Sequence, residues 1–375
     1  MASVEHILIV GGGLAGLALA HGLQQQGFTP ELVERNASWE TVGAGIFLHA
    51  NAMRVLRSLG LDAEVERAGT VIRRWAFYGQ SGERLSETDL AEVWDGLGPC
   101  VGIARPALHK VLLAAAGTTR ARLGMAVTSL VQADEQVRVG FSDGSSAVYD
   151  LVVGADGIQS TVRQLTWDGV PVGYTGVMCW RGIVPMRPAG VSGWTGVFGD
   201  GVVFGLVPLG DGHTYGFAFA GGPQIHDPLE GRLARIRERF AALRGPVPAY
   251  LAALTRDEDL HCAPIEWVEM PEWHSGHVVV IGDAAHAGPP TMAQGGAMAL
   301  EDAYVLADVL GAETSVESAL RVYASRRGPR VRWVEEQSRA MAAMFRTDYA
   351  TFTAMFRERA DAQMRALYRP LIPAP

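Results

Sequence analysis

The chain has 375 residues, of which 48% are hydrophobic, 8% aromatic and 19% charged, and this composition excludes an intrinsically disordered protein. The net charge of -8 provides no global field that attracts nucleic acid, so we exclude nucleic-acid partners. The three cysteines have no metal-site spacing, and no stretch resembles a signal peptide or a membrane span. We therefore expect a cytoplasmic protein with reduced thiols, no metal and no membrane partner.

The first predicted strand is the apolar run ILIV at residues 7–10, which is typical of a strand buried on both faces of a parallel sheet. The glycine-rich run GGGLAG follows it, and a helix is predicted over residues 17–26. A second strand is predicted over residues 31–34. This order of strand, glycine turn, helix and strand is the opening of a dinucleotide-binding fold.

Each glycine of the turn has a physical role. Gly11 allows the tight turn, Gly13 lets backbone amides approach a pyrophosphate, and Gly16 lets the helix pack closely on the strand. Glu34 ends the second strand, where a carboxylate binds ribose hydroxyls and repels a 2′-phosphate. These residues predict either NAD or the adenosine half of FAD.

The middle of the chain has a different character, rich in Val, Phe, Trp and Tyr with Gly and Pro between the runs. Residues 202–207 and 214–219 are predicted strands of an antiparallel sheet, and residues 72–97 contribute another strand to it. A helix is predicted over residues 232–243.

Two further buried strands, at residues 151–154 and 278–282, are each followed by an acidic residue, Asp156 and Asp283. An acid at the carboxyl end of a parallel strand lies at the ligand edge of the sheet. Asp283 could therefore bind the ribityl hydroxyls of FAD, a chain that NAD lacks. The helix that starts near Gln294 could direct its amides and dipole at the isoalloxazine ring, which favours FAD over NAD.

From residue 301 onward the sequence pattern predicts helices. A group of large apolar side chains near its end recurs at roughly helical spacing, and it predicts a packed or interface helix or, alternatively, a cap over a substrate cavity. The group comprises Met341, Met344, Phe345, Phe352, Met355 and Phe356.

Taken together, these motifs resemble the single-component FAD-dependent aromatic hydroxylases, the para-hydroxybenzoate-hydroxylase-like flavoprotein monooxygenases. The matching strings are the glycine motif with Glu34 and Arg35, VGADGIQSTVR at residues 153–163, and GDAAH, PP, AQGG and EDA between residues 282 and 303. The loop GAGI at residues 43–46 and the string WRG at residues 180–182 also match. The resemblance covers nearly the whole chain.

The resemblance implies an α/β fold: a discontinuous Rossmann-like FAD-binding domain, an inserted antiparallel-sheet substrate domain, and C-terminal helices. We expect the FAD-binding domain at residues 1–71, 98–167 and 275–330, the substrate domain at 72–97 and 168–274, and the C-terminal helices at 331–375.

The implied FAD-binding residues come from every motif. They are Gly11, Gly13, Leu14, Ala15, Gly16, Glu34, Arg35, Gly45, Ile46, Arg105, Val127, Asp156, Asp283, Gly295 and Gly296. In the family, NADH or NADPH reduces FAD, and a flavin C4a-hydroperoxide then hydroxylates the substrate with oxygen from O2. The chain has no second glycine motif, so the nicotinamide is expected to bind transiently. We expect a small aromatic or polyketide-like substrate and a monomer or homodimer.

The catalytic and substrate residues are separate hypotheses. His49 follows the flavin loop and could act as a base near neutral pH, or it could be a packing histidine. His213 and Tyr215 would share one face of a regular strand and are the other catalytic candidates. Arg181 could bind a substrate carboxylate or form a structural salt bridge, and Pro290 is expected beside the substrate.

Several alternatives stay open. The same fold hosts Baeyer–Villiger oxygen insertion and oxidative decarboxylation. A flavin-dependent halogenase would need a W-x-W-x-I-P string and a catalytic lysine, whereas this chain has WRGIVP at residues 180–185 and a single lysine, Lys110. A non-catalytic nucleotide-binding redox sensor is the alternative outside enzymes.

Overall fold

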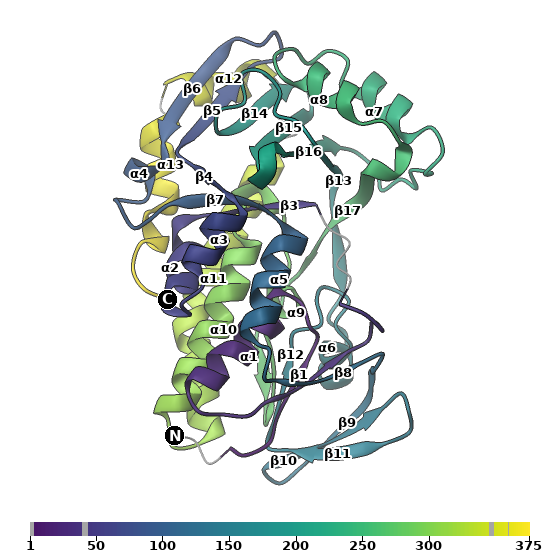
Figure 1. The fold of residues 1–375 in the computed structure, drawn as a ribbon, viewed down its shortest axis with the longest axis vertical. Helices are drawn as coiled ribbons and strands as arrows, with labels where there is room; N and C mark the ends of the chain where they lie inside the picture. The colour runs from purple at the N-terminus through teal and green to yellow at the C-terminus, as the bar shows by residue number, and fades with distance from the viewer. Residues whose placement is uncertain (1–3, 40–43, 345–348, 359) are drawn as a thin grey trace.

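The computed structural model describes residues 4–39, 44–344, 349–358 and 360–375. Two large sheets form its two halves, one in the lower and one in the upper part of Figure 1. The long helices α10 (Gly295–Ala312) and α11 (Val316–Met344) run between and beside them. This arrangement confirms the predicted α/β fold class.

The lower half is built on a six-stranded sheet in the order β18-β19-β12-β1-β2-β8. Its central strand β1 pairs in parallel with β12 on one side and β2 on the other, and all four of its residues are buried. Only the short edge strand β18 runs antiparallel to its neighbour. The strands are β1 (Ile7–Val10), β2 (Glu31–Glu34), β8 (Arg120–Leu123), β12 (Leu151–Gly154), β18 (His274–Ser275) and β19 (Val278–Val280).

Helix α1 (Leu14–Gln25) begins directly after the glycine turn, three residues before the predicted start. It packs closely against helix α10: a Cβ atom on Gly22 would lie 3.1 Å from the Cβ of Ala307. The small residues on α1 allow this approach, which brings the helix after the glycine motif next to the helix that begins at AQGG. The other helices of this half are α2 (Ala50–Ser58), α3 (Asp62–Ala68), α5 (Arg105–Ala115), α6 (Thr161–Thr166) and α9 (Asp283–His286).

The upper half is a seven-stranded sheet in the order β17-β13-β16-β15-β14-β5-β6. The β5 and β6 strands come from residues far upstream of the others, as predicted for residues 72–97. One face belongs to the core shared with the lower half, and the other packs against α7 (Arg232–Arg239) and α8 (Val247–Ala253). The strands are β5 (Arg74–Tyr78), β6 (Arg84–Asp89), β13 (Val172–Val184), β14 (Trp194–Gly199), β15 (Val202–Pro208), β16 (Thr214–Gly221) and β17 (Leu260–Val268).

The predicted helix over residues 232–243 is shorter than expected and ends at Arg239. Phe240 and Leu243 follow it as buried residues of a turn, so their apolar side chains reflect packing under the sheet rather than a continued helix.

Two small sheets complete the fold. The β3-β7-β4 sheet lies between the halves, and the β11-β10-β9 sheet lies at the lower end in Figure 1. Their strands are β3 (Gly45–Leu48), β4 (Thr70–Ile72), β7 (Cys100–Ala104), β9 (Val127–Ala133), β10 (Gln136–Phe141) and β11 (Ser146–Tyr149).

The C-terminal helices α12 (Tyr349–Glu358) and α13 (Ala360–Tyr368) lie beside β5, β6 and α4 (Leu90–Val93). Arg357 pairs with Glu83, and Arg365 pairs with Glu92. These surface pairs tie the end of the chain to the edge of the seven-stranded sheet. Among the helices in the described ranges, none is both long enough and apolar enough to cross a membrane.

Candidate flavin and substrate site

The glycine turn after β1 has the geometry that the sequence predicts. Gly11 has φ +107°, and a Cβ atom there would lie 2.5 Å from the carbonyl oxygen of Ala155. A Cβ atom on Gly16 would lie 2.0 Å from the carbonyl oxygen of Gly11, so helix and turn touch. A Cβ atom on Gly13 would meet nothing within 4 Å. The space in front of α1, which Leu14 and Ala15 begin, is therefore open to a ligand phosphate.

Glu34 lies at this turn. Its Oε2 accepts a hydrogen bond from the amide of Gly12 at 2.8 Å, and its Oε1 accepts one from the amide of Asn36 at 2.8 Å. The amide of Met125 donates to the carbonyl of Glu34, which brings the segment before Val127 alongside. Arg35 is exposed next to them. The predicted adenosine-binding residues thus form one cluster.

The carboxylate of Asp156 has hydrogen-bond partners within the protein, at the start of α6. Its carboxylate accepts hydrogen bonds from the Ser160 hydroxyl at 2.5 Å and from the amides of Thr161 and Val162, so it caps the start of α6. Burial raises the pKa of Asp156, and these hydrogen bonds oppose the rise. Its predicted cofactor contact stays a prediction.

The loop with the string VGADGIQSTVR also supports the GDAAH turn. The Arg163 guanidinium is buried and donates to the carbonyls of Ile158 and Ala284, at 2.6 and 2.8 Å. The loop after β12 and the GDAAH turn are therefore held together at one edge of the six-stranded sheet.

Asp283 is exposed at the start of α9, directly after Gly282 with φ +60°. Within the described ranges, no protein group forms a hydrogen bond or an ion pair with its carboxylate. Further along, a Cβ atom on Gly295 would meet nothing within 4 Å, and one on Gly296 would lie 2.6 Å from Cδ1 of Ile46. The start of α10 therefore meets β3 at Ile46, and the carboxylate of Asp283 is open to a ligand.

These residues fit FAD. The open space at Gly13 suits a pyrophosphate, Glu34 suits the adenosine ribose, and the free Asp283 carboxylate suits a ribityl chain. The amides at Gly295 and the positive end of α10 suit the electron-rich edge of a flavin ring.

The flavin loop meets the seven-stranded sheet at Gly45. A Cβ atom on Gly45 would lie 2.5 Å from the Cβ of Tyr215 on β16. The amide of Arg105 donates to the carbonyl of Ala44 at 3.0 Å, so Arg105 follows the same loop and is exposed there. Burial raises the pKa of Tyr215 well above its usual range, and Arg181 and Arg105 oppose the rise. The structure therefore brings Gly45, Arg105, Arg181 and Tyr215 into one neighbourhood.

Arg181 has no ion-pair partner among the described residues, which is against the structural salt bridge weighed for it. Its Nε is buried without a hydrogen bond. It lies opposite Phe217 of β16 in the sheet register. A buried guanidinium nitrogen without a partner costs free energy, so it indicates a position suited to a ligand.

The face of the seven-stranded sheet that joins the shared core is strongly aromatic. Phe356 of α12 packs against the rings of Phe77 and Phe198, with both centroid distances 4.8 Å. Met341 and Met344 are half-buried against the same core, whereas Phe345 and the side chains of Phe352 and Met355 lie outside the described residues. The aromatic residues of this face are Trp75, Phe77, Trp194, Phe198, Tyr215, Phe217 and Phe219.

His49 is fully buried in a cage of four rings, those of Phe47, Trp75, Trp94 and Tyr368, at centroid distances of 4.5 to 5.5 Å. Neither ring nitrogen has a hydrogen-bond partner. Burial lowers the pKa of His49 to about 3. The expected titration near neutral pH is therefore wrong, because burial without a counter-charge disfavours the imidazolium. Its catalytic role stays a prediction.

The shared face expected of His213 and Tyr215 stays a prediction. β16 begins at Thr214, and His213 ends the turn Gly210–Gly212, in which Asp211 has φ +57°. His213 itself has extended backbone, with φ −73° and ψ 160°, and its carbonyl accepts a hydrogen bond from the amide of Leu209 at 2.9 Å, next to the first residue pair of β15 and β16.

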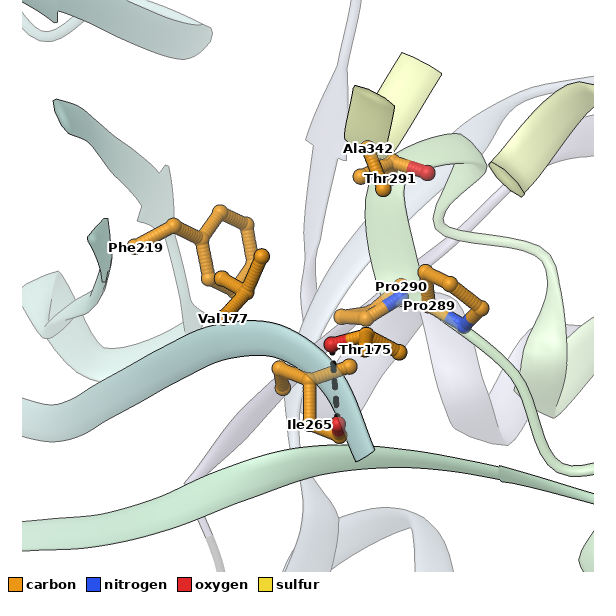
Figure 2. A pocket seen from close by; sticks show the side chains of 8 residues that line it. All are labelled: Thr175, Val177, Phe219, Ile265, Pro289, Pro290, Thr291 and Ala342. Atoms are coloured by element: carbon orange, nitrogen blue, oxygen red, sulfur yellow. Dashed lines mark hydrogen bonds between the residues drawn. The ribbon is translucent and has the colours of Figure 1, made fainter. Parts of the chain in front are cut away.

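Pro290 lines a narrow pocket between the two halves, shown in Figure 2. The pocket has a cavity volume of only about 10 Å³ and an apolar lining. The Thr175 hydroxyl donates to the carbonyl of Ile265 at 2.8 Å, and the Thr291 hydroxyl donates to that of Ser338 at 2.7 Å. Both threonine hydroxyls therefore already form hydrogen bonds with backbone carbonyls of the protein. The remaining lining residues are Val177, Phe219, Pro289 and Ala342.

A buried charge network that the sequence did not indicate lies behind the turn that presents Asp283. Asp302 lies 2.5 Å from Nε2 of His286 and 2.8 Å from Nε of Arg327, and all three side chains are buried. The EDA string was a signal for the carboxylates, but no pattern in the sequence indicated Arg327 as their partner.

Comparison with known proteins agrees with this site. The family described as FAD binding domain matches residues 5–188 and 251–338. Aurachin C monooxygenase/isomerase of Stigmatella aurantiaca is 35% identical over 84% of this chain and 83% of its own length. The 2-heptyl-3-hydroxy-4(1H)-quinolone synthase of Pseudomonas aeruginosa is 31% identical over 88% and 87%.

Among solved structures, Klebsiella pneumoniae HpxO complexed with FAD and uric acid superimposes with a TM-score of 0.92 and 26% identity, covering 100% of this chain and 98% of that one. The matched family spans both the glycine turn and the GDAAH motif. The chain belongs to the FAD-binding-domain family and is an FAD-dependent monooxygenase of the aromatic hydroxylase type.

Proposed function

We propose that the substrate is a compact, planar and electron-rich heteroaromatic ring that carries an oxygen substituent, with 4-quinolones as the first class to test. When bound, FAD takes a hydride from NADH or NADPH and activates O2 for transfer to this ring. The chain's own residues hold both molecules and exclude water.

The observation that carries this proposal is the aromatic face with one unpartnered guanidinium. Flat aromatic rings favour a flat ligand, because offset stacking and edge-to-face contacts add to the burial of apolar area. Arg181, whose Nε has no protein partner, would donate to the ring oxygen of the substrate. A cation at that oxygen stabilises its deprotonated form, which makes the ring a better nucleophile.

The assignment of the cofactor residues is part of the proposal. Glu34 and the segment at Val127 would hold adenosine, the turn Gly11–Gly16 the pyrophosphate, Asp283 the ribityl chain, and Gly295 with Gly296 the ring. Gly45 and Ile46 would lie along the other side of the flavin ring, because Ile46 contacts Gly296 and Gly45 contacts Tyr215.

The relatives support a heteroaromatic substrate, since their printed names include a quinolone synthase, aurachin C monooxygenase/isomerase and urate hydroxylases. The proposal of a flat ring rests on this chain's own aromatic face and not on any single relative.

The experiment is a screen of NADH and NADPH oxidation by the FAD-loaded enzyme with 2-alkyl-4(1H)-quinolones, urate, 4-hydroxybenzoate and a cyclic ketone. We expect a quinolone to accelerate oxidation and to gain one oxygen with its rings intact. A lactone from the ketone would instead support Baeyer–Villiger insertion, and a product lacking CO2 would support oxidative decarboxylation. Acceleration by 4-hydroxybenzoate alone would contradict the proposed class.

A further inference from the structure

Two consecutive carboxylates, Glu301 and Asp302, lie in the first half of α10 and are completely buried. One guanidinium joins them: Arg327 of α11 donates to Oε2 of Glu301 at 2.6 Å and to Oδ1 of Asp302 at 2.8 Å. Arg330 donates to both oxygens of Glu301, at 2.6 and 2.8 Å. Two carboxylates are thus balanced by two guanidiniums within the core.

Asp302 reaches the turn that presents Asp283. Its Oδ2 accepts a hydrogen bond from the amide of Gly282 at 2.9 Å and one from Nε2 of His286 at 2.5 Å. These two residues flank Asp283, at the start and the end of the short helix α9. The position of the exposed Asp283 carboxylate therefore depends on a carboxylate that is completely buried.

Glu301 reaches the start of its own helix by a different route. Its Oε1 accepts a hydrogen bond from the side-chain amide of Asn51 at 2.9 Å, and the same amide lies 2.9 Å from Oε1 of Gln294. Gln294 is the residue before Gly295, where α10 begins. Asn51 belongs to α2, which follows β3 and its Ile46.

Such a network is not needed for stability alone. Taking several charges out of water costs free energy that apolar residues of similar volume would avoid, so buried ion networks are weak evidence for stability. Here Arg327 and Arg330 hold the pKa of Glu301 below its usual value despite burial, and His286 and Arg327 do the same for the pKa of Asp302. What the network supplies is fixed geometry, because it holds both the turn at Gly282 and the start of α10 in place.

We propose that Glu301 and Asp302 are positioning residues for FAD: Asp302 orients the turn that binds the ribityl chain, and Glu301 orients the helix start that faces the flavin ring. This inference rests on the proposed assignment of Asp283 and Gly295 to FAD. It adds to that assignment the prediction that the two arms, which share Arg327, have separable effects on the cofactor.

The test uses one variant for each arm, and neither variant changes a carboxylate. His286→Leu removes the donor to Asp302, and Asn51→Val removes the link from Glu301 to Gln294. Because a hydrogen bond to a charged group is lost, we expect His286→Leu to raise the Kd of FAD about tenfold for the apoprotein. We expect Asn51→Val to shift the flavin midpoint potential and to change the Kd of FAD less than His286→Leu does.

Two further variants separate positioning from general stability. His286→Gln, whose side-chain Nε2 can take the place of the histidine Nε2 and donate to Asp302, should restore most of the FAD affinity. Asp308→Asn breaks the partly exposed Arg326–Asp308 pair between the same two helices and should change neither the Kd nor the potential. If Asn51→Val does not fold, Asn51→Ser serves, because serine is too short to join Gln294 and Glu301.

The proposal is overturned if His286→Leu and Asn51→Val lower the melting temperature of the apoprotein but leave both the Kd of FAD and the midpoint potential at the values of Asp308→Asn. It is also overturned if His286→Gln binds FAD as weakly as His286→Leu. Neither readout needs a substrate, so failure of the proposed substrate class would not produce these results.

Discussion

Gly45 and Tyr215 touch at the junction of the two halves, where a Cβ atom on Gly45 would lie 2.5 Å from the Cβ of Tyr215. Gly45 begins β3, next to the loop that would pass the flavin, and Tyr215 lies on the aromatic face of the seven-stranded sheet. The contact places the wall proposed for the substrate directly against the wall proposed for the cofactor. Oxygen transfer between two bound molecules requires this closeness.

The first prediction concerns this contact. Gly45→Ala should destabilise the protein by about 1–3 kcal/mol, because the added methyl overlaps the tyrosine side chain in a packed core. Thermal unfolding measures the loss. Gly288→Ala is the control, since a Cβ atom at residue 288 would meet nothing within 4 Å. Equal melting temperatures for the two variants would show that the junction rearranges freely.

A second prediction concerns Asp283. Asp283→Ala should raise the Kd of FAD about ten- to hundredfold, because hydrogen bonds between the ribityl hydroxyls and a carboxylate are charge-assisted. Fluorescence titration of the apoprotein with FAD measures the change. The exposed Asp168, in the turn after α6, gives the control Asp168→Ala. Unchanged affinity in a folded Asp283→Ala protein would remove the carboxylate from the cofactor site.

The sequence predicted the cofactor half well because its signals are local. The turn at Gly11, Gly13 and Gly16 requires small residues at fixed spacing, and a carboxylate at the end of a parallel strand must lie at the ligand edge. These constraints act within a few residues of the chain. Both Glu34 and Asp283 therefore lie where their strands place them.

The substrate half was harder to predict because its properties arise from contacts between distant segments. The low pKa of His49 comes from rings contributed by β5, the segment after α4, and α13. The bridge from Arg327 to Glu301 and Asp302 joins two helices, and no spacing rule within one helix reveals it.

A third prediction concerns Arg181. Arg181→Gln should lower kcat/KM for the best substrate about ten- to hundredfold, because a charge-assisted hydrogen bond to the ring oxygen is lost. FAD content should be unchanged. Arg239→Gln is the matched control, because that guanidinium stacks on Trp180 on the opposite face of the sheet. Equal kcat/KM for the two variants would exclude Arg181 from substrate binding.

A fourth prediction concerns the pH dependence of stability. The pKa of His49 is about 3 when folded, whereas an unfolded histidine has its ordinary value of 6.5. Between these values the unfolded state binds the extra proton, so stability falls as the pH is lowered below about 6.5. From pH 7.5 to 5.5 this histidine alone should cost about 1.3 kcal/mol.

Urea unfolding of the apoprotein at the two pH values measures this loss in the free energy of unfolding. His49→Leu should lose less stability than the wild type by about that amount, roughly 1.3 kcal/mol. His226→Leu, at an exposed position, should follow the wild type. A His49→Leu protein with the wild-type pH dependence would show that the imidazole gains its proton while folded.

The most direct measurement is turnover of a 2-alkyl-4(1H)-quinolone by the FAD-loaded enzyme under ¹⁸O2 with NADH or NADPH. One ¹⁸O atom should enter the ring system, with the rings intact and with one reductant consumed per product. A product oxygen derived from water, or reductant consumption that yields only hydrogen peroxide with every ring tested, would contradict the proposed oxygen transfer to a planar heteroaromatic substrate.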